Sequence, residues 1–224
     1  MNVKQTFKSY LYTPLIFITK LILVGLLFGS WLFTLYKSPD ILNLNLEELV
    51  NYGLFVSHLT GTIFALIMIL IYSRLFSNIR LGNLKDKSSL YFVLSIALLY
   101  LISSIGLPKE EYVTTIFDKS LLGKISVALT IFLIAPIGEE IVFRGFLLNP
   151  FLKYKKWLQC AGIIFCSLIF AYIHKSQYHI FVIAQLFLFS VIVSISRIKS
   201  GGILLPIILH IEASFLAVFF NKLL

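Results

Sequence analysis

The chain has 224 residues, of which 59% are apolar and 13% are charged, and its mean hydropathy is +0.96. This composition excludes a water-soluble globular domain and indicates a polytopic membrane protein. The net charge of +9 would suggest nucleic-acid binding in a soluble protein, but the basic residues concentrate in short connections between apolar runs. That distribution is typical of membrane topology, and we expect no nucleic-acid partner.

The apolar runs predict an all-α transmembrane bundle of about seven spans, because about 20 apolar residues in a helix cross the bilayer core. Segment 38–52 mixes apolar and acidic residues and predicts a helix lying in the membrane interface. No internal repeat or long linker divides the chain, so we expect one membrane-embedded domain over 1–224. Three spans and the interfacial segment fall in 1–122, and four spans in 123–221. The predicted spans are 14–36, 53–76, 88–106, 123–148, 157–174, 178–197 and 201–221.

The basic residues also predict an orientation. Alternate connections hold eleven Lys and Arg residues on one side of the predicted bundle and six on the other. Because an excess of basic residues marks the cytoplasmic side, we expect a cytoplasmic N-terminus and an external C-terminus. The short chain suggests an integral protein of a bacterial cytoplasmic membrane, with lipid around it.

The fourth predicted span carries two adjacent carboxylates and an arginine, Glu139, Glu140 and Arg144. Ionisable groups at membrane depth are costly and usually mark a functional site. Glu140 and Arg144 are four residues apart with the acid first, which is the favourable order for an ion pair on one helix face. Glu139 is rotated from Glu140 by about 100°. It can therefore face a cavity while Glu140 neutralises the arginine.

Three residues around these carboxylates disturb or open the helix. Pro136 removes a backbone hydrogen bond and favours a kink one turn before the acids. Gly138 and Gly145 allow another helix to approach closely. We interpret Glu139 as the functional acid of this segment, whereas the neighbouring ion pair either supports the site or only fixes helix packing.

Two later spans each contain a histidine. His174 closes the fifth predicted span, and His210 lies nine residues into the seventh. Ser214 follows His210 by one turn, so its hydroxyl shares a helix face with the imidazole. Together with Glu139, the two imidazoles are sufficient to activate a water molecule. The predicted boundaries place His174 near the outer face, so these groups meet only if the fifth helix is tilted or begins deeper.

Other polar residues in the apolar runs carry weaker signals. His58 in the second span and His179 after the fifth have no partner at helical spacing, and we expect both to be structural or interfacial. Glu212 faces about 200° away from His210 on the same helix. The sequence assigns Glu212 no role.

Three motifs in this order resemble those of a known family. They are E-E-x-x-x-R over 139–144, F-x-x-x-H over 170–174 and G-x-L-x-P-x-x-x-H over 202–210. The pattern is similar to the CAAX prenyl endopeptidase family of intramembrane proteases, also called CPBP or Abi, which includes bacteriocin self-immunity proteins. The resemblance extends from Pro136 to Ser214, and the first 120 residues match only in being hydrophobic.

The resemblance implies a membrane-embedded peptidase in which Glu139, His174 and His210 are essential. Glu140 and Arg144 would be the second glutamate and the arginine of the first motif. The residue that precedes the first histidine by four would be an aromatic supporting residue, here Phe170. The substrate implied is a membrane-associated peptide or protein, either prenylated or unmodified, that reaches the site from the bilayer.

The mechanism that we expect is general acid–base hydrolysis. Glu139 acts with His174 to deprotonate water, while His210 and Ser214 stabilise the oxyanion. The family motif usually has Asn or Asp at the position of Ser214, and a serine hydroxyl has a shorter reach.

A metal-dependent alternative stays open. Glu139, His174 and His210 would bind a divalent zinc ion with Glu140 as the base, because two histidines, one carboxylate and an open position match a hydrolytic zinc site. The chain lacks the usual H-E-x-x-H signature. We therefore expect either no cofactor or a divalent metal, and we favour metal-independent chemistry.

Two other functions compete with a protease. The first is a non-catalytic bacteriocin-immunity or regulatory protein that binds a peptide or a partner membrane protein. The second is a proton-coupled transporter in which Glu139, Glu212 and the two span histidines form a relay. The absence of an internal repeat argues against the transporter.

Overall fold

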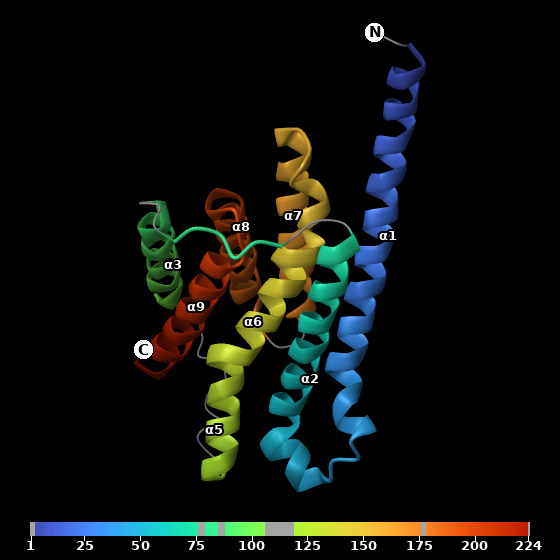
Figure 1. The fold of residues 1–224 in the computed structure, drawn as a ribbon. Helices are drawn as coiled ribbons and strands as arrows, with labels where there is room; N and C mark the ends of the chain where they lie inside the picture. Colours follow the sequence, from blue (N-terminus) through green and yellow to red (C-terminus); the bar gives the residue numbers. More distant parts are fainter. Residues whose placement is uncertain (1–2, 76–78, 85–87, 106–118, 176–177, 224) are drawn as a thin grey trace.

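The computed structural model describes residues 3–75, 79–84, 88–105, 119–175 and 178–223, and every regular element in these ranges is helical. Figure 1 shows the arrangement of these helices. Their bounds are α1 (Val3–Ile41), α2 (Leu46–Leu75), α3 (Ser88–Ser104), α5 (Leu121–Leu129), η2 (Thr130–Ile134), α6 (Ala135–Glu140), η3 (Ile141–Leu147), η4 (Asn149–Phe151), α7 (Lys156–Ile173), α8 (Ile180–Ser200) and α9 (Leu204–Leu223).

The helix α6 occupies the centre of the bundle (Figure 1). It contacts α2 on one side and α9 on the other, and α1 packs along α2. The helices α7 and α8 form a second packed pair, and α3 lies against α8 and α9. The carboxylates on α6 are therefore surrounded by helices that are distant in the sequence.

The predicted spans are confirmed as helices, but not all of them are confirmed as full spans. Segments 14–41, 46–73, 121–151, 156–173 and 180–200 are long and apolar enough to cross a membrane. The apolar helices Ser88–Ser104 and Leu204–Phe220 are shorter. In the described part of the chain the protein thus has five helices of membrane-spanning length, and it is an integral membrane protein.

The predicted interfacial helix over 38–52 is wrong. Helix α1 continues through Ile41, and α2 begins at Leu46, so the segment is divided between two long helices. Asn45 and Glu48 explain the start of α2, because each side chain accepts a hydrogen bond from the other residue's backbone N–H, at 2.9 and 3.0 Å. This reciprocal arrangement satisfies N–H groups that a helix start leaves unpaired.

The helical segment over 121–151 is interrupted on both sides of the carboxylates. A π-helical stretch, η2, precedes α6, and a second, η3, follows it. Pro136, in the first turn of α6, has no N–H to donate to the preceding turn, which fits the break there. The path bends between α5 and α6, in agreement with the predicted kink (Figure 1). Single π turns occur frequently at functional sites.

The start of α9 is held in place by backbone contacts. Gly201, at φ +69°, ends α8 in the left-handed conformation that glycine adopts at low cost. Ile203 and Leu204 then donate backbone hydrogen bonds to the carbonyls of Arg80 and Leu81, at 3.1 and 3.0 Å. These bonds fix where α9 begins and so help to set the depth of His210, two turns further along.

Candidate active site

Close packing of α2 against α6 positions the two glutamates. The hydroxyl of Thr62 donates to the Ile134 carbonyl at 2.9 Å. A Cβ atom on Gly138 would lie 2.3 Å from the same hydroxyl oxygen, so only glycine permits this approach. The helix contact that the sequence predicted at Gly138 is therefore present, one residue before Glu139. Gly145 has only ordinary contacts, because its nearest neighbour would be the Ile79 side chain at 3.5 Å.

Glu140 and Arg144 form the predicted ion pair, and both side chains are fully buried. Arg144 Nη1 donates to Glu140 Oε1 at 2.8 Å. Arg144 Nη2 donates to the carbonyl and to the hydroxyl of Ser190 on α8, at 3.1 and 2.9 Å. The pair thus joins α8 to the central helix. Ser190 was not predicted, because a serine within an apolar span gives no signal of its partner.

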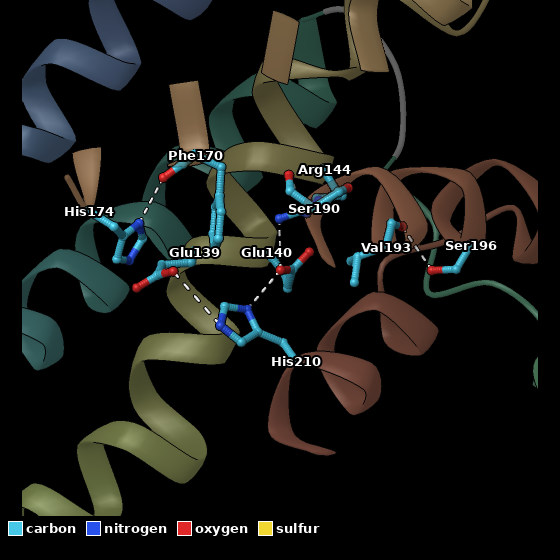
Figure 2. Close-up of polar contacts among 9 residues, drawn as sticks. All are labelled: Glu139, Glu140, Arg144, Phe170, His174, Ser190, Val193, Ser196 and His210. Atoms are coloured by element: carbon cyan, nitrogen blue, oxygen red, sulfur yellow. Dashed lines mark hydrogen bonds and ion pairs between the residues drawn. The ribbon is translucent and has the colours of Figure 1, made fainter. Parts of the chain in front are cut away.

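His210 shares the same carboxylate oxygen. Its Nδ1 donates to Glu140 Oε1 at 2.8 Å, and its Nε2 lies 3.9 Å from Glu139 Oε2 (Figure 2). The first distance is a hydrogen bond, whereas the second is too long for one and is a longer electrostatic contact. Glu140 therefore holds the imidazole so that the other nitrogen faces Glu139. This is the orienting role that a buried acid has beside a catalytic histidine.

His174 joins the site by folding back over its own helix. It follows the last residue of α7, and its Nδ1 donates to the carbonyl of Phe170 at 2.7 Å. A neutral ring with this proton on Nδ1 keeps Nε2 free to accept. In Figure 2 the Glu139 carboxylate lies between the rings of His174 and His210. The difference in depth that the predicted spans implied is reduced by this orientation of the side chain.

Phe170 forms the apolar wall of the site. Its ring centroid lies 4.8 Å from that of His174 and 5.9 Å from that of His210. The guanidinium carbon of Arg144 lies 5.2 Å from the same centroid. Phe170 is 1% exposed, so it excludes solvent between the two imidazoles and the ion pair.

Two further polar residues, Ser214 and His58, differ in how they relate to this cluster. Ser214, half-buried one turn after His210, has no hydrogen bond to Glu139, His174 or His210 in the part of the chain that the structure describes. His58 on α2 was expected to be structural or interfacial, yet the charged form of its imidazole interacts with Glu139, His174 and His210. The sequence signal that could have found it is a histidine in the middle of an apolar span.

The charges of the cluster are nearly balanced. Glu140 and Arg144 neutralise each other, which leaves Glu139, with a side chain 8% exposed, as the remaining acid. A buried carboxylate without a cation is costly, so Glu139 depends on the polar groups around it for stabilisation. Such a set can accept a proton from water and return it to a leaving group.

The metal-dependent alternative requires Glu139, His174 and His210 to bind one ion. Within the described ranges, no three His, Cys, Asp or Glu side chains are placed to hold one metal ion. The Nδ1 atoms of His174 and His210 donate to oxygen acceptors, which leaves the two Nε2 atoms as the ring nitrogens that could bind a metal. As placed, Glu139 and these two imidazoles do not form a three-ligand metal site.

Comparisons with known proteins identify the family of the chain. The family model of type II CAAX prenyl endopeptidase Rce1-like proteins matches residues 121–216, a range that includes both glutamates, Arg144, His174 and His210. An Escherichia coli protein described as an uncharacterized 24.3 kDa protein is 37% identical over 178 residues, which cover 76% of this chain and 82% of that protein. No solved structure matches the chain. The chain belongs to the Rce1-like family of type II CAAX prenyl endopeptidases, a family of membrane-embedded proteases.

Proposed function

We propose that this protein hydrolyses a peptide bond within the membrane, with Glu139 and His174 activating the water. The observation that carries the proposal is the hydrogen-bonded series from Arg144 through Glu140 to His210, which ends with Nε2 of His210 3.9 Å from Glu139. A purely structural ion pair would not need to orient an imidazole toward a second carboxylate. The series supports a site built for proton transfer.

The first half of the reaction is attack by water on the peptide carbonyl. A water molecule held beside Glu139 gives a proton to that carboxylate while its oxygen bonds to the carbonyl carbon. Nε2 of His174, free to accept, holds the second hydrogen of the water and orients it. When the tetrahedral intermediate collapses, the C–N bond breaks and Glu139 returns its proton to the leaving nitrogen.

The negative charge that develops on the carbonyl oxygen must be stabilised by hydrogen-bond donors. His210 supplies one from Nε2 when its ring is doubly protonated, a form that the Glu140 carboxylate on Nδ1 stabilises. The Ser214 hydroxyl, one turn further on α9, is available as a second donor. In that state Glu139 carries the proton taken from water, so the net positive charge of His210, Glu140 and Arg144 together balances the charge of the oxyanion.

The substrate reaches this site from the lipid. The family name implies a prenylated protein ending in a CAAX sequence, and an unmodified membrane-associated peptide is the alternative. A pair of fluorogenic peptides separates the two, one with a farnesylated cysteine and the other with the free thiol at the same position. Faster turnover of the first peptide supports prenyl recognition, and equal turnover contradicts it.

The Glu139→Gln variant tests the chemistry. We expect loss of cleavage without loss of folded protein, because glutamine keeps the shape of the side chain but accepts no proton. The Glu212→Gln variant is the matched control, since that acid lies on α9 outside the hydrogen-bonded series and should be dispensable for turnover. Wild-type turnover by Glu139→Gln, or binding of the peptides without cleavage by the unmodified protein, contradicts a protease. Elemental analysis of the active protein tests the metal-dependent version.

A further inference from the structure

His58 is a polar residue at membrane depth that the reaction described above does not use. It lies twelve residues into α2, and no Asp, Glu, Lys or Arg occurs between Glu48 and Arg74. Its side chain is half-buried. An imidazole at the middle of such a span is costly unless it faces a polar space or a partner.

The packing of α2 places His58 on the face of that helix that meets α6. Thr62 and His58 are four residues apart and share this face. Thr62 meets Gly138 and the Ile134 carbonyl, directly beside the turn that carries Glu139. Because α2 runs parallel to segment 121–151, with Asn51 beside Gly123, His58 lies about one turn before the level of the glutamates on the same side of α2.

This position agrees with the electrostatics of the imidazole. Its charged form interacts with Glu139 on α6, His174 on α7 and His210 on α9. These three residues are the acid and the two imidazoles to which the reaction is assigned. In Figure 2 the ribbon of α2 (teal) passes on the side of Glu139 and His174, and α9 carries His210 from the other side.

The ring of His58 is free to bind another molecule. Within the described residues it has no hydrogen bond, whereas His174 and His210 each have an Nδ1 atom bonded to an oxygen. A neutral imidazole offers one N–H donor and one acceptor. A peptide that is unwound inside a membrane for cleavage exposes backbone groups that have no water to bond.

We propose that His58 holds the substrate, by donating a hydrogen bond to a backbone carbonyl of the peptide on the α2 side of Glu139. This inference rests on the proposed function and adds a substrate-binding contact outside the matched range 121–216. The peptide then lies across α6, with its scissile carbonyl toward His210 and a neighbouring carbonyl on His58.

The test measures binding in the Glu139→Gln background, in which the peptide is not consumed. The probe is the farnesylated peptide with a fluorescein label, and its Kd is read by fluorescence anisotropy. One hydrogen bond contributes roughly 1.4 kcal/mol at such a site, so His58→Leu should raise Kd about tenfold. His58→Gln, which keeps a donor, should stay within about threefold. In the active protein the same change should raise KM and leave kcat nearly constant.

His179→Leu is the matched control, since this imidazole lies at the exposed start of α8 and stacks on Phe181 with a centroid distance of 5.3 Å. If His58→Leu does not fold, His58→Met replaces it. An unchanged Kd for the apolar variant, or equal weakening by Leu and Gln, overturns the contact. Wild-type cleavage by Glu139→Gln instead overturns the proposed function, so the two failures are distinguishable.

Discussion

The buried ion pair between Glu140 and Arg144 gives a quantitative test of the site. We consider Arg144→Met and Glu140→Gln separately and together. Each single change leaves one charge without its partner, in a place where both side chains are fully buried and 2.8 Å apart. Breaking a buried pair in this way costs about 3–5 kcal/mol. For a chain of this size, about 4 kcal/mol corresponds to a fall in Tm of about 8–16 °C.

The double variant removes both charges and should cost no more than either single variant. His210 then keeps an acceptor in the amide oxygen that replaces the Glu140 carboxylate, and the hydrogen bonds from Arg144 to Ser190 are the main loss. Thermal unfolding in detergent, followed by tryptophan fluorescence, measures all three proteins. Lys37→Met is the control, because its pair with Asp40 is exposed and should contribute less than about 1 kcal/mol. Additive costs, or single costs below about 1 kcal/mol, would refute the coupling.

Three further changes test the packing and the oxyanion side. Gly138→Ala forces a Cβ atom toward Thr62 and should destabilise the protein by about 1–3 kcal/mol and lower kcat. Gly145→Ala, whose Cβ would make only ordinary van der Waals contacts, should leave Tm and turnover unchanged. Phe170→Leu removes the ring that contacts both imidazoles, so it should lower the free energy of unfolding by about 1.5 kcal/mol and reduce kcat. An unaltered kcat would contradict the proposal that this ring supports the two imidazoles. Ser214→Ala should lower kcat about tenfold through loss of one donor, and wild-type turnover in a peptide assay would remove Ser214 from the mechanism.

Features of the site that depend on one helix could be predicted from the sequence. The Glu140–Arg144 pair follows from a four-residue spacing, and the close approach at Gly138 follows from a small residue in an apolar span. These predictions need only the helical repeat. The apolar runs likewise predicted where the helices lie, with ends close to those observed for the later helices, whereas α1 and α2 are longer than the predicted spans and take up the segment expected to be interfacial.

Contacts between helices could not be predicted in the same way. The bond from His210 to Glu140 joins residues 70 positions apart and depends on how far α9 is rotated and inserted. The hydrogen bond from Arg144 to Ser190 depends on the rotation of α8. The position of His58 near the site residues depends on the rotation of α2. The direction of the His174 side chain, which folds back along α7, could not be predicted either, because a span boundary carries no information about it.

The two π-helical stretches around α6 have a consequence for related sequences. A π turn holds about one residue more than an α turn, so removing one residue from 130–134 would restore an ordinary turn there. The segment before the gap would rotate by about 100° around its axis, while Glu139 and Glu140 stay fixed by Thr62, Arg144 and His210. Single-residue gaps in relatives should therefore gather at 130–134 and 141–147, and the short stretch of chain between them should tolerate none.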